Sequence, residues 1–197
     1  MKRAIVMSVL GAATCLVANR VAAQGTITFA NYTGGGATAP VTFAGAAFGG
    51  FTAGETIGSG FTAELLYSST GVTYNSTGST TAFIAPSGTA PSAGGGLFGG
   101  LAVSATVPGY VSGNAWFEVQ VYNGANYGAS TIKGTSAAFE LSAVATALNA
   151  LPVGDFFDAR AVTPISAFTV AAVPEPATMA LGGLGLASLL LFRRKQV

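Results

Sequence analysis

Few side chains in this 197-residue sequence could catalyse a reaction. It contains no histidine and a single cysteine, Cys15, so the commonest general base is missing and thiol chemistry is confined to one position. Two carboxylates, Glu64 and Glu118, could hydrolyse a glycosidic bond if they lay about 5–9 Å apart. Both occupy the polar phase of a strand-like segment, where a solvated carboxylate is the ordinary outcome. Lys133 could act with a serine, but Lys133-Gly134 is typical of a turn. We therefore expect no catalytic residue and no enzymatic activity.

Metal binding has one weak candidate. Asp155 and Asp158 follow Gly154 and could offer carboxylate oxygens to calcium. Their spacing lacks the alternating carboxylates of an EF-hand loop. The alternative is a loop in which Phe156 and Phe157 pack inward while the two acids face water. A single cysteine excludes a cysteine-cluster zinc site and an intramolecular disulfide. No metal site and no cofactor is expected, and the sequence leaves calcium binding by Asp155 and Asp158 open.

Three aromatic residues suggest a binding surface. Trp116 and Tyr122 fall on the same face of one strand-like segment, and Tyr127 follows closely. Rings on a sheet face can stack on sugar rings, which would make the domain a carbohydrate-binding module. The same rings could instead fill the core of the domain. The sequence leaves both possibilities open.

The charge pattern excludes one class of partner. Only 8% of the residues are charged, against about 25% in an ordinary soluble domain, and the formal net charge is +1. No basic block lies in the body of the chain, so recognition of nucleic acid through phosphate contacts is not expected. Residues 24–173 are mildly acidic. Their charged side chains are Glu55, Glu64, Glu118, Glu140, Asp155, Asp158, Lys133 and Arg160.

The elements that must position these side chains are strands. Apolar and polar residues alternate in several short segments rich in β-branched and aromatic residues, which is the strand signature. Glycine runs at 34–36, 94–96 and 99–100 indicate turns or loops, and residues 138–148 favour one helix that Pro152 would end. The fold class expected for residues 24–173 is all-β, an antiparallel β-sandwich or jelly roll. The alternating segments are residues 26–32, 61–67, 101–107, 115–122 and 166–170.

Residues 1–23 are typical of a signal peptide. Lys2 and Arg3 precede an apolar run of about 15 residues, shorter than the roughly 20 of a spanning helix. Small residues then precede a cleavage site expected between Ala23 and Gln24. Lipidation at Cys15 is not expected, because the residues before it lack the leucine and the small residue that lipidation requires.

The C-terminus contains a second targeting pattern. Val173-Pro174-Glu175-Pro176 is followed by an uncharged run, 177–192, and by the basic residues Arg193, Arg194 and Lys195. The prolines keep the motif extended. The apolar run is about 24 Å long as a helix, short for a bilayer but usable with local thinning. The basic end is expected in the cytoplasm, which places the middle of the chain across the membrane.

This order of motif, short helix and basic end resembles the PEP-CTERM sorting signal, over about 25 residues. The resemblance implies recognition by an exosortase, a multi-pass membrane protease, near Pro174, Glu175 and Pro176. It also implies export to the cell surface or an exopolysaccharide matrix. In a bacterial protein of this kind the sequons at Asn31 and Asn75 are incidental.

The body between the tags also resembles a recurring type of exported PEP-CTERM ectodomain. Such bodies open with a segment like Gly-Thr-Ile-Thr-Phe-Ala-Asn, at 25–31, and close with a strand like 165–170. The expected organisation is a signal peptide at 1–23, a β ectodomain at 24–173 and a sorting signal at 174–197. The expected function is a surface or matrix protein with a structural or adhesive role. A carbohydrate-binding module is the alternative, and a carboxylate-dependent glycoside hydrolase is third. Exosortase, the membrane and possibly extracellular polysaccharide are the expected partners.

Overall fold

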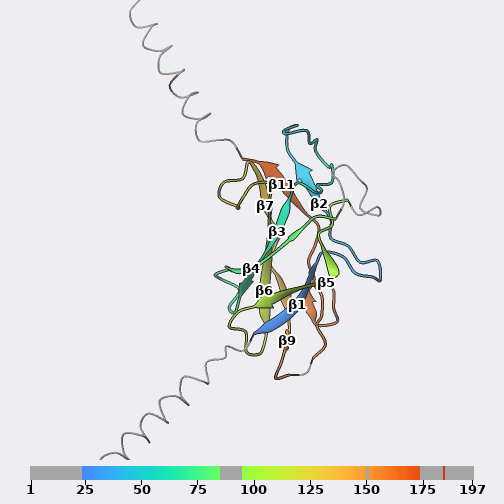
Figure 1. The fold of residues 1–197 in the computed structure, drawn as a ribbon, viewed down its shortest axis with the longest axis vertical. Helices are drawn as coiled ribbons and strands as arrows, with labels where there is room; N and C mark the ends of the chain where they lie inside the picture. The colour runs from blue at the N-terminus through green and yellow to red at the C-terminus, as the bar shows by residue number, and fades with distance from the viewer. Residues whose placement is uncertain (1–23, 85–94, 150, 174–183, 185–197) are drawn as a thin grey trace, which may run out of the picture.

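The described part of the chain is built from strands (Figure 1). The computed structural model describes residues 24–84, 95–149, 151–173 and residue 184. The strands are β1 (Gly25–Ala30), β2 (Val41–Ala44), β3 (Thr62–Ser68), β4 (Asn75–Ala82), β5 (Gly99–Val107), β6 (Ala115–Tyr122), β7 (Ile132–Thr135), β8 (Phe139–Leu141), β9 (Ala145–Thr146), β10 (Ala161–Thr163) and β11 (Phe168–Ala172).

Burial alternates along these strands as the sequence predicted. In β6, Phe117, Val119 and Val121 are fully buried while Trp116 and Glu118 are only half-buried. Successive side chains of a strand point to opposite faces, so a period of two in hydrophobicity becomes one buried and one outward face. The all-β prediction is confirmed for the described residues of the domain, 24–84, 95–149 and 151–173.

The strands form two sheets. The larger has eight strands, in the order β10-β8-β6-β7-β11-β2, with β3 on the other edge of β6 and β4 beyond it. The smaller has three strands, in the order β5-β1-β9. Strand β6 is central because β3 pairs along its whole length, whereas β7 and β8 divide its opposite edge between them.

One aromatic core joins the two sheets. Phe156, fully buried in the loop after β9, lies with its ring centroid 4.7 Å from that of Phe139 and 6.4 Å from that of Phe117, both in the larger sheet. It also lies 6.0 Å from Phe29 of β1, in the smaller sheet. The expectation that Phe156 packs inward is therefore confirmed. Burial of large apolar side chains between the layers is the main stabilising term of such a fold.

A buried amide fastens the loops beside β1. Asn31 is fully buried, and its side-chain nitrogen donates to the carbonyls of Ala39 (2.7 Å) and Gly96 (2.9 Å). Its side-chain oxygen accepts a hydrogen bond from the backbone nitrogen of Phe98 at 2.7 Å. Three backbone groups far apart in sequence are thereby satisfied by one side chain. The sequon at Asn31 is thus part of the interior.

Three expectations from the sequence were wrong. Residues 138–148 do not form a helix: Phe139 and Leu141 are buried two residues apart in β8, and β9 follows. The pair Gly99-Gly100 opens β5 rather than a turn. The sheet is also not purely antiparallel, because β11 pairs with β2 in parallel, from Phe168 opposite Val41 to Ala171 opposite Ala44. The other described strand pairings are antiparallel.

The two ends of the described domain lie at opposite poles. In Figure 1, β1 and β9 lie in the lower half of the molecule and β11 ends in the upper half beside β7. The register agrees: Gly25 pairs with Val107, just before the turn that enters β6 at Ala115. Ala172 instead pairs with Ile132, near the end of β6. We call these the N-terminal pole and the C-terminal pole.

Candidate functional site

The aromatic residues singled out from the sequence lie outside the core. Trp116 and Tyr122 occupy the outward phase of β6, together with Glu118 and Gln120. Neither ring belongs to the buried cluster between the sheets. Trp116 and Tyr122 stand at opposite ends of the strand, six residues or roughly 20 Å apart.

Tyr122 is covered by its neighbours. Its side chain is 5% exposed, and its ring packs edge-on against Tyr127 with centroids 6.2 Å apart. The ammonium of Lys133 lies 4.9 Å from the centre of the Tyr127 ring and donates to the Tyr127 carbonyl at 2.9 Å. A ring so enclosed offers no open face for a sugar.

The predicted position of Lys133 in a turn was also wrong. It lies in β7, opposite Tyr122, rather than in a turn. The described contacts of its ammonium are with Tyr127 and not with a serine hydroxyl. The structure therefore does not assemble a Ser–Lys pair from this side chain.

Trp116 lies beneath the hairpin that connects β3 and β4. A Cβ atom at Gly71 would approach the indole to 3.3 Å, so the backbone of this turn lies next to the ring with little room for a side chain. Tyr74 donates from its hydroxyl to the Gly71 carbonyl at 3.4 Å. The three aromatic residues thus form two separate contacts rather than one continuous platform for a sugar chain.

Glu64 and Glu118 share the same outward face. Glu64 pairs with Gln120 and Glu118 with Leu66, so the two acids are diagonal neighbours across β3 and β6. Diagonal positions in an antiparallel pair are typically about 7–8 Å apart. Glu64 accepts hydrogen bonds from the hydroxyls of Ser76 and Tyr122, the latter at 3.3 Å. Two carboxylates are brought near each other, but one is already engaged by its neighbours.

Burial raises the pKa values of several groups on this outward face. Desolvation raises the pKa of the Glu118 carboxyl above its usual range. Burial and the nearby Glu118 carboxylate raise the pKa of Tyr74, and burial together with Glu64 raises that of Tyr122. Both phenols therefore remain protonated donors at neutral pH.

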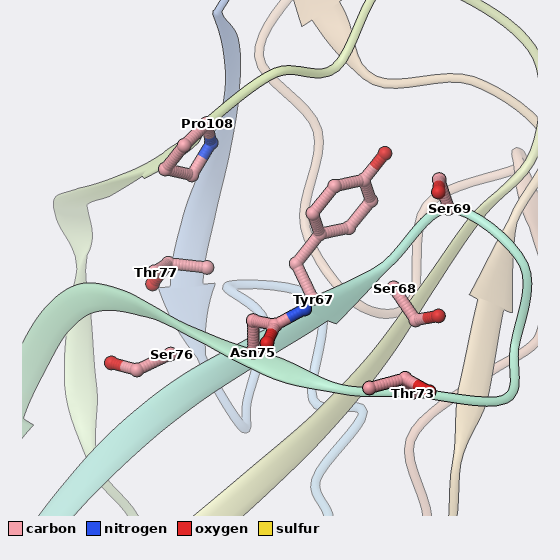
Figure 2. Close-up of a pocket in the computed structure, with 8 residues that line it drawn as sticks. All are labelled: Tyr67, Ser68, Ser69, Thr73, Asn75, Ser76, Thr77 and Pro108. Carbon is pink, nitrogen blue, oxygen red and sulfur yellow. The ribbon is translucent and has the colours of Figure 1, made fainter.

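A hollow of about 170 Å³ opens at the N-terminal pole (Figure 2). It lies between the β3–β4 hairpin and the turn that follows β5, so it joins segments some forty residues apart in sequence. No sequence pattern indicated it, because the Ser/Thr-rich hairpin and the Pro-Gly turn after β5 are each ordinary turns on their own. Its lining residues are Tyr67, Ser68, Ser69, Thr73, Asn75, Ser76, Thr77 and Pro108.

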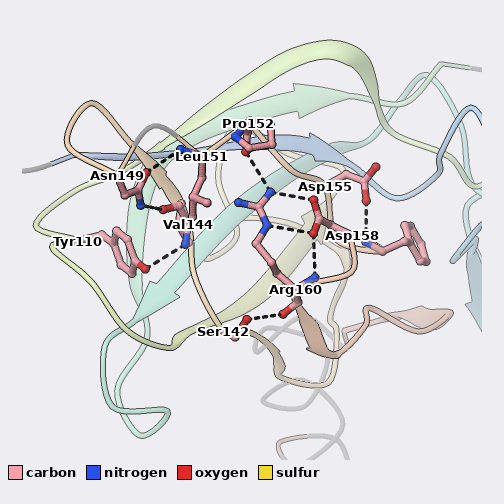
Figure 3. Close-up of polar contacts among 10 residues, drawn as sticks. Tyr110, Ser142, Val144, Asn149, Leu151, Pro152, Asp155, Asp158 and Arg160 are labelled. Carbon is pink, nitrogen blue, oxygen red and sulfur yellow. Dashed lines mark hydrogen bonds and ion pairs between the residues drawn. The ribbon is translucent and has the colours of Figure 1, made fainter.

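The aspartates proposed for calcium have other partners (Figure 3). Arg160 forms an ion pair with Asp158 at 2.7 Å and a second bond to the other carboxylate oxygen at 2.9 Å. Asp155 accepts from the backbone nitrogen of Phe157 at 2.8 Å. The hydrogen bonds from Arg160 lower the pKa of Asp158 against the opposing effect of burial. A calcium ion would have to displace this guanidinium.

Arg160 also links this loop to its surroundings. Its guanidinium donates to the carbonyl of Pro152 at 3.0 Å, and its backbone carbonyl accepts from Ser142. Within the described residues, no group of three acidic or cysteine side chains is placed to hold a metal ion. The cluster is consistent with a structural role in closing the loop between β9 and β10.

The residues predicted to direct targeting lie at or beyond the borders of the described domain. Gln24 is exposed and directly precedes β1, while Ala23 lies outside the described residues. The proposed motif Pro174, Glu175 and Pro176 and the basic residues Arg193, Arg194 and Lys195 also lie outside them. No helix in the described part of the chain is long and apolar enough to cross a membrane. Of the predicted spanning run, Leu184 is described, and it is helical.

The segment that leads into the sorting motif is held in the larger sheet. Strand β11 lies between β7 and β2, and the backbone nitrogen of Val173 donates to the Thr131 carbonyl at 2.8 Å. The next residue is Pro174, which carries no N–H group. The sheet therefore holds the chain up to the residue before Pro174-Glu175-Pro176.

Comparison with known families gives one match. The model of the PEP-CTERM protein-sorting motif matches residues 172–195. No curated protein and no solved structure matches the chain. The match confirms the resemblance found at the C-terminus and says nothing about the β domain. The chain carries a PEP-CTERM protein-sorting motif, which marks it as an exported protein whose membrane-anchored precursor is processed by an exosortase.

Proposed function

We propose that this protein is a structural or adhesive component of the cell surface or extracellular matrix, released from its anchor by an exosortase. The observation that carries the proposal is the sorting motif at 172–195, which begins within the last strand of the β domain. A folded domain joined directly to a sorting signal is the part of the chain that sorting delivers. Its low charge and hydroxyl-rich surface suit a passive surface component.

The proposal includes an N-terminal signal peptide. Strand β1 begins at Gly25, so cleavage between Ala23 and Gln24 would remove the leader and leave the strand intact. We expect the mature protein to begin at Gln24, as read by N-terminal sequencing or intact mass. A mature chain that begins at Cys15 with added lipid would contradict this.

The proposal assigns no catalysis to the domain. Glu64 is engaged by Ser76 and Tyr122, and Lys133 by Tyr127, so the potential acid and base groups have structural partners. Hydrolysis of glycosidic bonds that is lost in Glu118→Gln and retained in Glu140→Gln would favour the hydrolase instead. These variants are matched because both acids are half-buried strand residues.

The sorting function is tested by following release in the native host. Replacing Pro174, Glu175 and Pro176 by alanine removes the recognition element and makes the segment more apolar, so insertion should persist and release should stop. An epitope on the β domain is followed in membrane and released fractions, with and without the exosortase. Pro164→Ala, in the exposed loop before β11, is the matched control and should release normally. Equal release of the triple variant would show that the tail is an anchor alone.

A further inference from the structure

We propose that the hollow at the N-terminal pole is a binding site for one uncharged sugar unit of a neutral polysaccharide. The inference rests on the proposed surface role for its biological setting, and it names the kind of ligand that an adhesive domain would hold. It concerns the lining residues of Figure 2 and not the aromatic face of β6.

Four lining side chains have free hydrogen-bonding capacity. The side-chain polar groups of Tyr67, Ser69, Thr73 and Asn75 line the hollow and make no hydrogen bond within the described residues. Their counterparts in the same hairpin are engaged. The Ser68 hydroxyl accepts from the backbone nitrogen of Gly71 at 3.0 Å, for example. A ligand rich in hydroxyls can replace the water on the free groups without disrupting the fold.

The other lining hydroxyls keep the hairpin in shape. Thr77 donates from its hydroxyl to the Leu65 carbonyl at 2.9 Å and accepts from the Ser79 backbone nitrogen at 3.1 Å. These bonds hold β4 against β3 next to the hollow. The free groups are therefore presented on a fixed support, which lowers the entropy that binding must overcome.

The phenol of Tyr67 is held in place by the core. Its ring centroid lies 5.7 Å from that of Phe117 and 6.4 Å from that of Tyr110, and the ring is half-buried. In Figure 2 the ring stands between Pro108 and Ser69. Burial, with a smaller effect of Tyr110, raises the pKa of this phenol, so it stays a hydrogen-bond donor. Tyr67 thus gives the wall of the hollow an apolar ring and a polar hydroxyl group.

The lining also selects against charge. None of the eight lining residues is ionised at neutral pH, and the nearest acid in their network, Glu64, is bonded to Ser76 and Tyr122. Anionic ligands such as phosphates and uronic acids would find no cation there. Metal ions would find no carboxylate within the lining. Neutral hydroxyl chemistry remains as the best match.

The volume limits the ligand to one ring. Liquid water occupies roughly 30 Å³ per molecule, so about 170 Å³ corresponds to a handful of water molecules. Pockets for drug-sized ligands run to about 300–1,000 Å³. An end or branch unit of a polysaccharide can enter while the rest of the chain lies outside.

The position in the fold fits a surface ligand. The hollow lies beside Ser68, which pairs with Trp116 at the start of β6, whereas the sorting motif follows β11 at the other pole. In the anchored precursor, the pole that carries the hollow therefore points away from the sorting motif. Exposed apolar residues lie in the turns of this pole, with Val72 82% and Val111 66% exposed. Such residues can contact the apolar faces of neighbouring sugar units.

The test measures sugar binding by the full-length protein, purified in detergent. The probes are oligosaccharides of glucose, galactose and mannose, and the corresponding uronic-acid oligomers, at equal concentrations. We expect binding to at least one neutral series and none to the uronic acids. Tyr67→Phe removes one hydroxyl and keeps the ring, so affinity should fall about tenfold, the effect of one lost hydrogen bond. Thr73→Val should weaken binding similarly.

Two matched variants separate the hollow from other surfaces. Tyr127→Phe removes a tyrosine hydroxyl that contacts Thr135, and Thr80→Val removes a threonine hydroxyl, both outside the lining. Both should bind as the unmodified protein does, and thermal unfolding of each variant checks that the fold is intact. Failure to bind any neutral probe, equal binding of uronic acids, or unchanged affinity in folded Tyr67→Phe would each overturn the proposal. None of these outcomes affects the release assay, so the proposed sorting function is judged separately.

Discussion

Asn31 holds the loops beside β1 together through its buried side-chain amide. Replacing Asn31 by alanine leaves the carbonyls of Ala39 and Gly96 and the backbone nitrogen of Phe98 without their partner. Each buried group left unsatisfied costs about 1–3 kcal/mol, and partial relaxation with water makes the sum smaller than three such terms. We expect Asn31→Ala to lower the free energy of unfolding by about 2–5 kcal/mol. Chemical denaturation of the released protein measures this.

The second sequon supplies the control. Asn75 is exposed and its side chain makes no described hydrogen bond. Asn75→Ala should therefore change stability by no more than about 0.5 kcal/mol. A loss in Asn31→Ala no greater than that in Asn75→Ala would show that the buried network contributes little.

The ion pair of Asp158 and Arg160 makes stability depend on pH. The pKa of Asp158 is lowered in the folded protein, so the unfolded chain takes up a proton first as pH falls. Its contribution is complete above the unfolded value of about 3.9 and is lost as pH drops below that toward the folded pKa. The two side chains are 23% and 18% exposed, so the carboxylate's hydrogen bonds should be worth about 1–3 kcal/mol.

Asp158→Asn is the corresponding variant. It should be less stable than the unmodified protein at pH 7, and the difference should shrink as pH falls below 4. Thermal unfolding over pH 2.5–7 gives both curves. Asp155→Asn serves as the comparison, because Asp155 bonds a backbone nitrogen rather than the guanidinium. A difference that stays constant with pH would exclude titration of Asp158 as its cause.

For single residues, the sequence predicted which side chains face outward better than it predicted which groups they contact. The outward phase of Trp116, Glu118 and Tyr122 followed from alternation alone. What covers Trp116 depends on a hairpin turn whose conformation is set at Gly71, with φ 74°. The link between Asp158 and Arg160 is local, yet two nearby aspartates alone are also typical of a cation site, and only the folded loop shows that Arg160 pairs with Asp158.

Among the elements, the junction of β1 and β5 places the strictest demand on the sequence. Gly99 has φ 75°, and a Cβ atom there would lie 1.9 Å from the carbonyl oxygen of Phe29. A Cβ atom at Gly100 would make an ordinary van der Waals contact with Val103 at 3.6 Å. Gly99→Ala combines an unfavourable backbone conformation with a clash and should cost about 2–5 kcal/mol. Gly100→Ala should change stability by less than about 1 kcal/mol.

Denaturation of the two alanine variants under the same conditions provides the comparison. Because Gly99 pairs with Ala30 where the register of β1 and β5 shifts, the effect should be specific to this position. Equal stability of the two variants would mean that the strand pair can move apart without cost. That result would argue against a tight contact between Gly99 and the carbonyl of Phe29.

The element scale also shows why parts of the fold escaped prediction. Strands β3 and β6 have clear alternation and were predicted within one or two residues. Residues 138–148 contain good helix formers, but Phe139, Leu141 and Val144 are all required in the core, and tertiary packing overrides local propensity. The parallel pairing of β2 with β11 joins segments more than 120 residues apart, and no local pattern encodes it.

At the scale of the whole molecule, the chain runs from one pole of the β domain to the other. The chain enters the sheet at Gly25, at one pole, and leaves it at the other, where Val173 is held by Thr131. The C-terminal sorting motif could be predicted from the sequence because its parts are local and follow one another along the chain. The hollow could not, because Tyr67 and Pro108 meet only when the hairpin folds against the turn after β5.

The last prediction concerns the anchor of the precursor. The uncharged run at 177–192 is short for a bilayer, so it has little hydrophobic free energy to spare. A charge at the centre of a spanning helix costs about 2.5–3.5 kcal/mol on insertion scales. Leu186→Arg should therefore reduce the ratio of membrane-inserted to non-inserted precursor about 70- to 400-fold in a host without exosortase. Gln196→Arg adds the same charge beyond the basic residues and should leave anchoring intact. The β-domain epitope is measured after carbonate extraction of membranes, and retention of Leu186→Arg equal to that of Gln196→Arg would show that this run does not span the membrane as a helix.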